Sequence, residues 1–169
     1  SFNIENALCS FASAFALGID KTIAKNTLEN FAGIKGRMEE VKNNKGIKIF
    51  IDFAHTPNGL KQALQTLRSK TSGRLISLIG CEGERDESKR PLMGEIASKL
   101  SDFVIITAVD PRGQLKKINS QILTGIKKSK ESVFVLDDRN KAIEFAIGKL
   151  SKKGDTIGIF GKGHETSMN

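Results

Sequence analysis

Apolar and polar positions follow two different rhythms along this chain. From residue 47 onward, short apolar runs occur at 47–53, 75–79, 103–107, 133–136 and 156–160. Amphipathic stretches separate them, at 57–70, 91–100, 116–128 and 138–150. Buried strands that alternate with helices are typical of βαβ units and a parallel sheet. The pattern predicts a doubly wound α/β domain over 47–169, with a mostly parallel sheet and helices on both of its faces.

The first 35 residues have the periodicity of helices instead. Ile4, Leu8, Phe11 and Phe15 recur at helical spacing, and a second short helix is expected after Asp20. Two short helices cannot bury their apolar faces alone, so residues 1–35 are interpreted as the tail of a larger body. The polar segment 36–46 is rich in glycine, asparagine and lysine, and it is predicted to be a linker.

The polar residues that follow each predicted strand are the candidates for chemistry. They lie in the segments 52–57, 80–86, 110–112, 137–139 and 161–165, all of which carry charged or glycine-rich sequence. Ligands of open parallel sheets bind beyond the carboxyl ends of the strands, where these segments are expected to meet. The convergence predicts a site for a small anionic or zwitterionic ligand.

Each of these segments also has a purely structural interpretation. Gly161-Lys162-Gly163 could hold an anion with its backbone amides, or it could be a turn after the last strand. The chain contains no Walker phosphate loop and no dinucleotide-binding glycine pattern. His55, just before Pro57, could contact a ligand or simply pack at a helix start.

Two arginines offer planar forks that fit a carboxylate or a phosphate. Arg85 lies in a charged loop that could equally be paired within itself. Asp110 and Arg112 flank a proline and could bind an amino acid, with Asp110 at the ammonium and Arg112 at the carboxylate, or they could form an ordinary turn. No serine or cysteine nucleophile motif is present, and no metal site is predicted from the two histidines.

The composition of the chain limits the classes of partner that can be expected. The net charge is +8, from 27 basic and 19 acidic residues, which favours anionic ligands. The lysines are spread along the chain, which has no Trp and no Tyr, so nucleic acid is not expected as a partner. No apolar run approaches the ~20 residues of a membrane span. Cys9 and Cys81 match no metal spacing, and reduced cysteines predict a cytoplasmic location.

Taken in their order along the chain, the motifs resemble those of the C-terminal domain of the Mur ligases. They are most similar to those of the tripeptide synthetase branch (MurE). The resemblance is carried by Gly36-Arg37-Met38-Glu39, Asp52-Phe53-Ala54-His55-Thr56-Pro57, Gly80 to Asp86, Lys89 to Gly94, Asp110-Pro111-Arg112 and Gly161-Lys162-Gly163-His164-Glu165. It covers nearly the whole chain, and residues 1–35 resemble the close of the family's central ATPase domain. Folylpolyglutamate and cyanophycin synthetases share the Asp-x-Ala-His-x-Pro element.

The resemblance implies an ATP-dependent amide ligase of peptidoglycan synthesis. Such ligases join a diamino acid, meso-diaminopimelate or lysine, to UDP-N-acetylmuramoyl-L-Ala-D-Glu through an acyl phosphate. It implies that Arg37, Asp52 and His55 face ATP, and that Arg85, Asp110, Arg112, Gly161 and Glu165 surround the amino acid. The family's phosphate loop and magnesium-handling residues belong to the central domain. The resemblance therefore implies a fragment that lacks the N-terminal and central domains and is inactive alone.

One departure from the family pattern concerns the amino acid. The pattern of diaminopimelate-adding members is Asp-Asn-Pro-Arg, whereas this chain has Val109-Asp110-Pro111-Arg112. Arg112 favours a substrate with a second carboxylate, while the extra charge of Asp110 favours an amine. The amino acid is left open by these residues. The alternatives are another Mur-like ligase of the folylpolyglutamate or cyanophycin type, or a non-catalytic domain that binds amino acids or phosphorylated metabolites.

Overall fold

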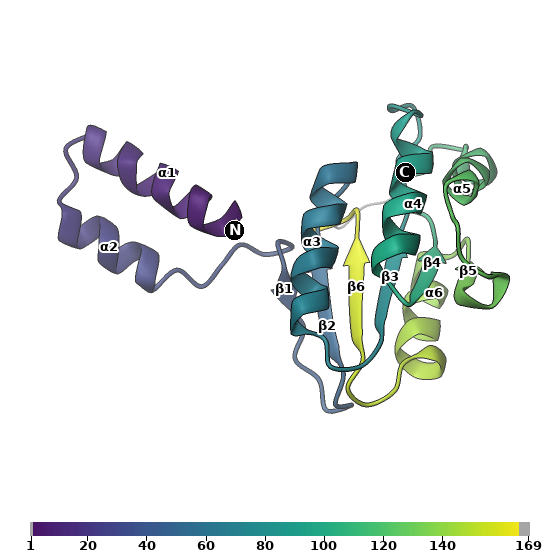
Figure 1. The fold of residues 1–169 in the computed structure, drawn as a ribbon. Helices are drawn as coiled ribbons and strands as arrows, with labels where there is room; N and C mark the ends of the chain where they lie inside the picture. The colour runs from purple at the N-terminus through teal and green to yellow at the C-terminus, as the bar shows by residue number, and fades with distance from the viewer. Residues whose placement is uncertain (1, 166–169) are drawn as a thin grey trace. The chain divides into compact units, whose positions relative to one another are not determined.

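The structure is a computed structural model that describes residues 2–165, with side chains from Ile4 onward. The chain divides into two compact units, one that ends at Ile34 and one that begins at Lys35. Each unit has its own arrangement of elements, and the larger one contains the sheet (Figure 1). No helix in the described part of the chain combines the length and apolar character needed to cross a membrane.

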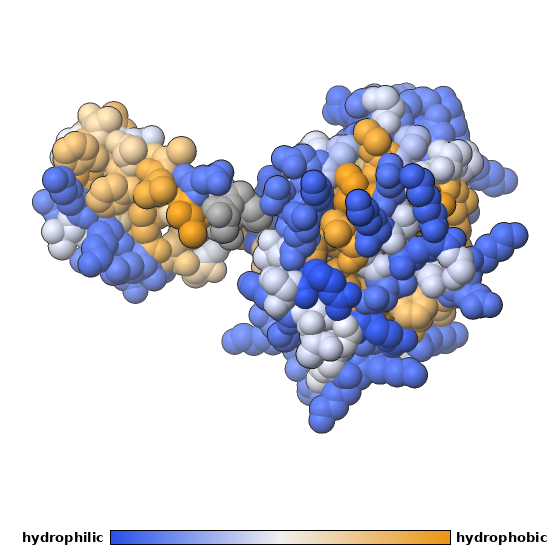
Figure 2. Space-filling view, in the orientation of Figure 1, coloured by the Kyte–Doolittle hydropathy of each residue, from blue (hydrophilic) through white to orange (hydrophobic). Residues whose placement is uncertain are grey.

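The first unit consists of the helices α1 (Phe2–Ala16) and α2 (Lys21–Glu29). Asp20 caps α2, because its carboxylate accepts the backbone N–H of Thr22 at 2.8 Å and of Ile23 at 3.3 Å. Most large apolar side chains of this unit are exposed, and apolar residues are visible on its surface in Figure 2. They include Ile4, Leu8, Phe15, Leu17, Ile23, Phe31 and Ile34. The described side chains of the helix pair, from Ile4 onward, therefore form no apolar core of their own.

The second unit is built on a six-stranded sheet with the order β1-β2-β6-β3-β4-β5. The predicted strands are confirmed as β2 (Lys48–Asp52), β3 (Leu75–Ile79), β4 (Phe103–Ile106), β5 (Val133–Val135) and β6 (Thr156–Phe160). Neighbours among these five run parallel. The short strand β1 (Glu39–Glu40) pairs antiparallel with β2. It lies within the segment expected to be a linker, where two glutamates give no apolar strand signal.

Helices cover both faces of the sheet, as the doubly wound pattern predicts. The helices α3 (Pro57–Lys70), α4 (Lys89–Leu100) and α5 (Leu115–Thr124) pack over one core, which includes Leu64, Met93 and Ile118. The helix α6 (Arg139–Phe145) and the π-helical turn η2 (Ala146–Leu150) pack over the other, and the 3₁₀ turn η1 (Lys130–Ser132) precedes β5. Alternate strand residues enter the two cores, so Ile105 faces one and Ile106 the other.

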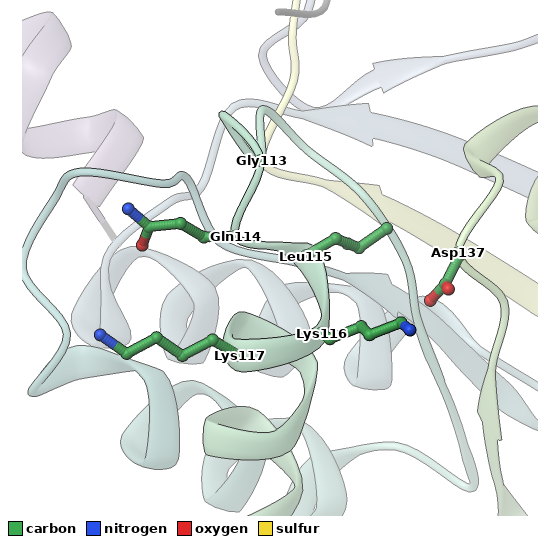
Figure 3. Close-up of a pocket in the computed structure, with 6 residues that line it drawn as sticks. All are labelled: Gly113, Gln114, Leu115, Lys116, Lys117 and Asp137. Carbon is green, nitrogen blue, oxygen red and sulfur yellow. The ribbon is translucent and has the colours of Figure 1, made fainter.

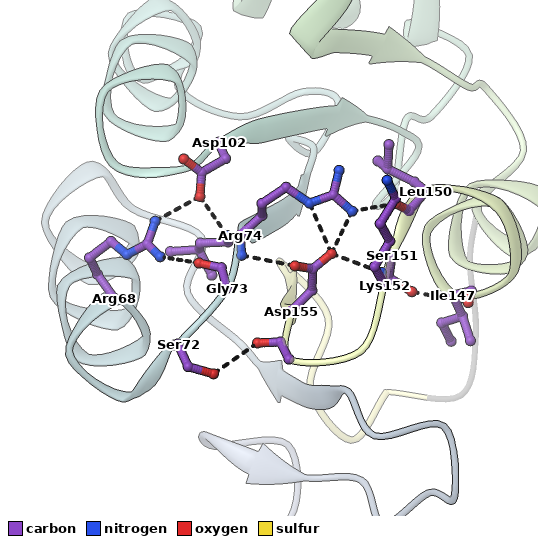
Figure 4. Close-up of polar contacts among 12 residues, drawn as sticks. Arg68, Ser72, Gly73, Arg74, Asp102, Ile147, Leu150, Ser151, Lys152 and Asp155 are labelled. Carbon is purple, nitrogen blue, oxygen red and sulfur yellow. Dashed lines mark hydrogen bonds and ion pairs between the residues drawn. The ribbon is translucent and has the colours of Figure 1, made fainter.

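Ion pairs tie the strand starts together at the amino edge of the sheet (Figure 4). The carboxylate of Asp155 accepts the backbone N–H of Arg74 at 2.9 Å and contacts its guanidinium at 2.6 Å. Beside it, Asp102 accepts a guanidinium N–H of Arg68 and the backbone N–H of Leu75, each at 2.7 Å. These contacts fix one edge of the sheet and leave the opposite, carboxyl edge for the loops that carry the candidate site.

Candidate functional site

Two glycines bring the first and last motifs of the second unit into contact. A Cβ atom on Gly36 would lie 2.4 Å from the carbonyl carbon of Gly163, and one on Gly163 would lie 2.8 Å from the carbonyl oxygen of Gly36. Side chains at either position would force the two backbones apart. The loop that carries Arg37 and the loop after β6 therefore form one continuous surface at the carboxyl edge.

Asp52 holds the Arg37 loop against the end of β2. Its side chain is buried, and its two oxygens accept the backbone N–H groups of Met38 and Ala54, both at 2.8 Å. The backbone carbonyl of Asp52 also accepts the N–H of Gly161 at 3.2 Å. The carboxylate of Asp52, which the resemblance predicts to face ATP, is thus bonded to the protein backbone.

Arg37, Phe53 and His55 form a row of contacting groups beside that turn, in which the two rings meet edge to face. The guanidinium of Arg37 lies 4.6 Å from the centre of the Phe53 ring, and the Phe53 and His55 rings are 4.8 Å apart at 61°. Nδ1 of His55 lies 3.1 Å from the carbonyl oxygen of Phe53. A carbonyl only accepts hydrogen bonds, so this contact requires a proton on Nδ1, and in a neutral ring Nε2 would then be a hydrogen-bond acceptor.

The loops after β3 and β4 run side by side in the second part of the site. Glu82 and Asp110 form an isolated parallel bridge, and Gly83 donates its N–H to the carbonyl oxygen of Asp110 at 2.8 Å. A Cβ atom on Gly83 would lie 2.2 Å from the carbonyl oxygen of Pro111. This contact places the segment of Arg85 beside the segment of Arg112.

Both of these arginines are paired with acidic residues of the same two loops. Arg112 lies 3.4 Å from Asp110 and 3.6 Å from Glu84, and Arg85 lies 3.8 Å from Glu82. The Arg85–Glu82 and Arg112–Glu84 pairs are open to solvent, since the side chain of Arg85 is 59% exposed and that of Glu84 is 63% exposed, and such pairs contribute about 0–1 kcal/mol. The Arg112–Asp110 pair is less accessible, because only 16% of the Asp110 side chain is exposed.

Gly161 packs against the loop after β4. Its φ is +90°, and a Cβ atom there would lie 2.9 Å from Cγ2 of Val109. Val109 is buried, and it also lies 2.7 Å from the Cβ position of Gly80. Val109, one of the two departures from the family pattern, thus fills the space between two glycine loops. Glu165 is exposed at the end of the loop that follows Gly161.

Backbone strain is concentrated in the loops of the site. Three non-glycine residues of the described chain have a left-handed backbone, namely Met38 with φ +48°, Glu84 with φ +53° and Arg112 with φ +45°. Each lies in one of the loops just described. Such conformations are retained where the surrounding structure fixes them, and they cluster at ligand sites. The strain independently supports the assignment of the site to this edge.

Two buried arginines contact the loops of the site, although neither is among the eight residues predicted to bind ATP or the amino acid. Arg90 is fully buried and donates to Oε1 of Gln121 at 2.5 Å and to the carbonyl oxygen of Glu82 at 3.0 Å. Arg139 is buried at the start of α6 and donates to two backbone carbonyls. Arg139 follows a predicted strand and Arg90 lies in the family-like motif Lys89 to Gly94, but burial of a charged side chain is not visible in a local pattern.

Among its described residues, the site shows neither an ionised thiol nor a metal-binding cluster. Burial raises the pKa of the Cys81 thiol to about 11, so the thiol stays protonated at neutral pH. Among residues 2–165, no group of three or more His, Cys, Asp and Glu side chains is placed to hold a metal ion.

A cavity of about 550 Å³ lies beside the Arg112 turn (Figure 3). It is lined by Gly113, Gln114, Leu115, Lys116, Lys117 and Asp137. Figure 3 shows Lys116 extending toward Asp137. None of the eight residues predicted to contact ATP or the amino acid lines this cavity.

The comparisons with known proteins agree with this geometry. Residues 36–163 match the sequence profile of the family described as "Mur ligase, glutamate ligase domain". The chain belongs to the Mur ligase family. The matched range contains seven of the eight predicted site residues, and Glu165 lies just beyond it.

Several relatives of this Mur ligase chain share one name. The UDP-N-acetylmuramoyl-L-alanyl-D-glutamate–2,6-diaminopimelate ligase of Clostridioides difficile (strain 630) is 46% identical over 166 residues, or 98% of this chain and 34% of the relative. The enzyme of the same name from Syntrophomonas wolfei is 43% identical over 97% of this chain and 34% of the relative. A solved structure of a ligase with this name has a TM-score of 0.74 and 33% identity, and the match covers 99% of this chain and 34% of that one. The chain thus spans about a third of the length of these relatives.

Proposed function

We propose that this Mur ligase chain is the part of a tripeptide synthetase that binds the diamino acid and covers the nucleotide. The complete enzyme would join a diamino acid to UDP-N-acetylmuramoyl-L-Ala-D-Glu during peptidoglycan synthesis. The observation that carries the proposal is the backbone contact between Gly36 and Gly163. It joins the loop of Arg37, on the nucleotide side, to the loop of Glu165, on the amino-acid side.

The reaction proposed for the complete enzyme has two steps. The γ-phosphoryl group of ATP is transferred to the peptide carboxylate, which gives an acyl phosphate and ADP. The amine of the diamino acid then attacks the acyl carbon, the amide bond forms, and phosphate leaves as the amine loses a proton. Neither step requires a covalent bond to this chain. Its contribution is to position the reactants and to stabilise charge.

On the nucleotide side, the row of Arg37, Phe53 and His55 presents a cation and, with His55 neutral, a hydrogen-bond acceptor to ATP. Asp52 acts there by fixing the turn that carries Arg37. The exposed guanidinium of Arg37 suits a phosphate oxygen, because its fork matches the geometry of the anion.

On the amino-acid side, Arg85 and Arg112 would bind carboxylates, while Asp110 and Glu165 would bind ammonium groups. Gly161 would allow the ligand to approach the backbone closely. We favour meso-diaminopimelate over lysine, because its second carboxylate can replace Glu84 as a partner of Arg112. The names of the relatives support this choice.

We further propose that residues 1–35 belong to the central ATPase domain of the complete enzyme, with 36–46 as the connection and 47–169 as the ligand-binding domain. The exposed apolar side chains of α1 and α2 support this division, since the rest of that domain would cover them. ATP and Mg²⁺ would be held mainly by the central domain. Use of ATP and a UDP-linked substrate places the enzyme in the cytoplasm.

The test uses the full-length gene product, with ADP release measured against the concentration of diamino acid. Arg112→Ala should raise the KM for the diamino acid roughly 10- to 100-fold, because a charge-assisted hydrogen bond contributes about 1.5–3 kcal/mol. Arg68→Ala is the matched control, since Arg68 is similarly exposed (38%) but pairs with Asp102 at the opposite edge. An equal effect of both variants, or binding of diamino acid without any turnover, would contradict the proposal. The second result would favour a non-catalytic binding domain.

A further inference from the structure

Arg139 occupies an unusual position for a charged side chain. It is the first residue of α6 and follows the end of β5, yet only 8% of its surface is exposed. Its guanidinium donates from Nη1 to the carbonyl oxygen of Ala108 at 3.2 Å and from Nη2 to that of Phe160 at 3.1 Å. These carbonyls belong to two different segments at the carboxyl edge of the sheet.

The two segments are the walls of the proposed amino-acid pocket. Phe160 ends β6 and is followed by Gly161, while Ala108 lies just beyond β4 and is followed by Val109, Asp110 and the Arg112 turn. In the sheet, β6 and β4 are not neighbours, because β3 lies between them. The single guanidinium therefore links two loops that no strand ladder connects directly.

The side chain of Val109 packs between the same loops and limits how closely they can approach each other. Val109 fills the space between Gly161 and Gly80, where a Cβ atom on either glycine would lie within 2.9 Å of it. The loops are thus in contact at Val109 and are held together by hydrogen bonds at Arg139. If the hydrogen bonds were lost, Val109 would still limit the approach of the loops but could not prevent them from separating.

A guanidinium is well suited to hold two backbone carbonyls at a fixed spacing. A guanidinium has donors fixed in one plane, so it can bond two carbonyls at a defined spacing, whereas an ammonium group cannot impose that geometry. The ion pairs found among the described residues do not include Arg139. Burial lowers the pKa of Arg139 to about 10, so it remains charged at neutral pH. A buried charge is costly unless the structure makes use of its hydrogen bonds.

We propose that Arg139 is a positioning residue that fixes the distance between the Gly161 loop and the Val109–Arg112 loop. Through that distance it would govern the affinity for the amino acid more than the affinity for ATP. The inference rests on the proposed function, because it assumes that these two loops enclose the amino acid. The row of Arg37, Phe53 and His55 also touches the Gly161 loop through the Gly36–Gly163 contact, but Asp52 and Lys89 hold it as well, so we expect the smaller effect on ATP.

The chain provides a matched control in Arg74. Its guanidinium also bridges two segments, since it donates to Asp155 at 2.6 Å and to the carbonyl oxygen of Leu150 at 2.8 Å. This bridge lies at the amino edge of the sheet (Figure 4), away from the pocket. A variant of Arg74 should therefore destabilise the fold without altering the distance between the pocket loops.

The experiment compares Arg139→Lys, Arg139→Met and Arg74→Met in the full-length ligase. The KM values for diamino acid and for ATP are measured together with the melting temperature. Arg139→Met should raise the KM for the diamino acid roughly 10- to 100-fold, as expected for reactants displaced by about 1 Å, with the KM for ATP changed less than about twofold. Arg139→Lys, which keeps the charge and can reach one carbonyl, should lie between wild type and Arg139→Met. Arg74→Met should lower the melting temperature and leave both KM values unchanged.

Hydrogen exchange of the same proteins gives a readout that does not depend on turnover. Arg139→Met should increase exchange in both 107–113 and 161–165, whereas Arg74→Met should not. Suppose that the wild-type enzyme is active. If Arg139→Met then leaves the KM for the diamino acid unchanged, or raises the KM values for diamino acid and ATP equally, the positioning role is wrong and the proposed function stands. If the wild-type enzyme shows no turnover that depends on the diamino acid, the proposed function is wrong, and unchanged hydrogen exchange in the two loops of Arg139→Met would refute the positioning role as well.

Discussion

Gly36 and Asp52 place functional side chains without contacting a ligand themselves. Gly36 allows the backbone of the Arg37 loop to touch that of Gly163, and Asp52 fixes Met38 in a left-handed conformation. The position of the exposed guanidinium of Arg37 thus depends on two residues with no reactive role. At this scale, the site is determined by backbone contacts as much as by its charged side chains.

Two glycine-to-alanine substitutions should have opposite effects on stability. Gly36→Ala puts a Cβ atom 2.4 Å from backbone at a φ of +72°, so it should lower the free energy of unfolding by at least about 2 kcal/mol. Gly148→Ala is the control, because nothing lies within 4 Å of its Cβ position and its φ is not left-handed. It should raise the free energy of unfolding by about 0.4–1 kcal/mol. Urea denaturation measures both, and a neutral Gly36→Ala would show that the two loops do not touch in solution.

The elements of the sheet have different roles at their two edges. At the amino edge, Arg74–Asp155 and Arg68–Asp102 pairs fix the strand starts, and at the carboxyl edge the loops are held by glycine contacts and by single arginines. The buried carboxylate of Asp155 therefore contributes to stability at the amino edge, whereas the exposed Arg85–Glu82 and Arg112–Glu84 pairs of the loops contribute little. This division predicts where pH affects the fold.

Acid should destabilise the second unit partly through Asp155. Burial alone would raise the pKa of this carboxyl, but hydrogen bonds from Arg74 and from the backbone of Lys152 outweigh burial, and the pKa lies below 3.8. Because the folded pKa is lower than the unfolded one, the stabilisation is complete above about pH 4 and is lost as pH falls through the folded pKa. Asp155→Asn should lower the free energy of unfolding by roughly 2–4 kcal/mol at pH 7 and should flatten the loss below pH 4.

The control for this prediction is Asp138→Asn, which keeps an equally good N-cap on α6 and should be close to neutral at pH 7. Denaturation curves between pH 2 and 7 measure the effect. A loss of stability below pH 4 that is as steep in Asp155→Asn as in wild type would show that this carboxylate does not contribute to the acid dependence.

The elements themselves were largely predictable, and the reasons differ from one to another. Strands such as 75–79 and 156–160 are continuous apolar runs of a sheet covered on both faces, so their pattern is unambiguous. The strand β1 was missed because two glutamates pair through their backbone alone. The edge at which the site residues meet followed from topology, but the link through Arg139 could not be predicted, because it depends on which loops become neighbours in the folded sheet.

At the scale of the whole molecule, the two units differ in how much of their apolar surface they bury. The second unit buries two cores and carries the loops of the site, whereas the first exposes most of its large apolar side chains. The net charge of +8 also fits partners that are phosphorylated or carboxylated. Both features agree with a domain that works within the longer ligase chain proposed above.

The most direct test is mass spectrometry of the product formed by the full-length ligase. Every reaction contains UDP-N-acetylmuramoyl-L-Ala-D-Glu, ATP and Mg²⁺. One reaction also contains meso-diaminopimelate, and a separate reaction contains lysine in its place. We predict a nucleotide-linked tripeptide whose mass corresponds to the addition of diaminopimelate with loss of one water, together with ADP in equal amount. ATP hydrolysis without any tripeptide, or a product formed by transfer to a different acceptor, would contradict the assignment.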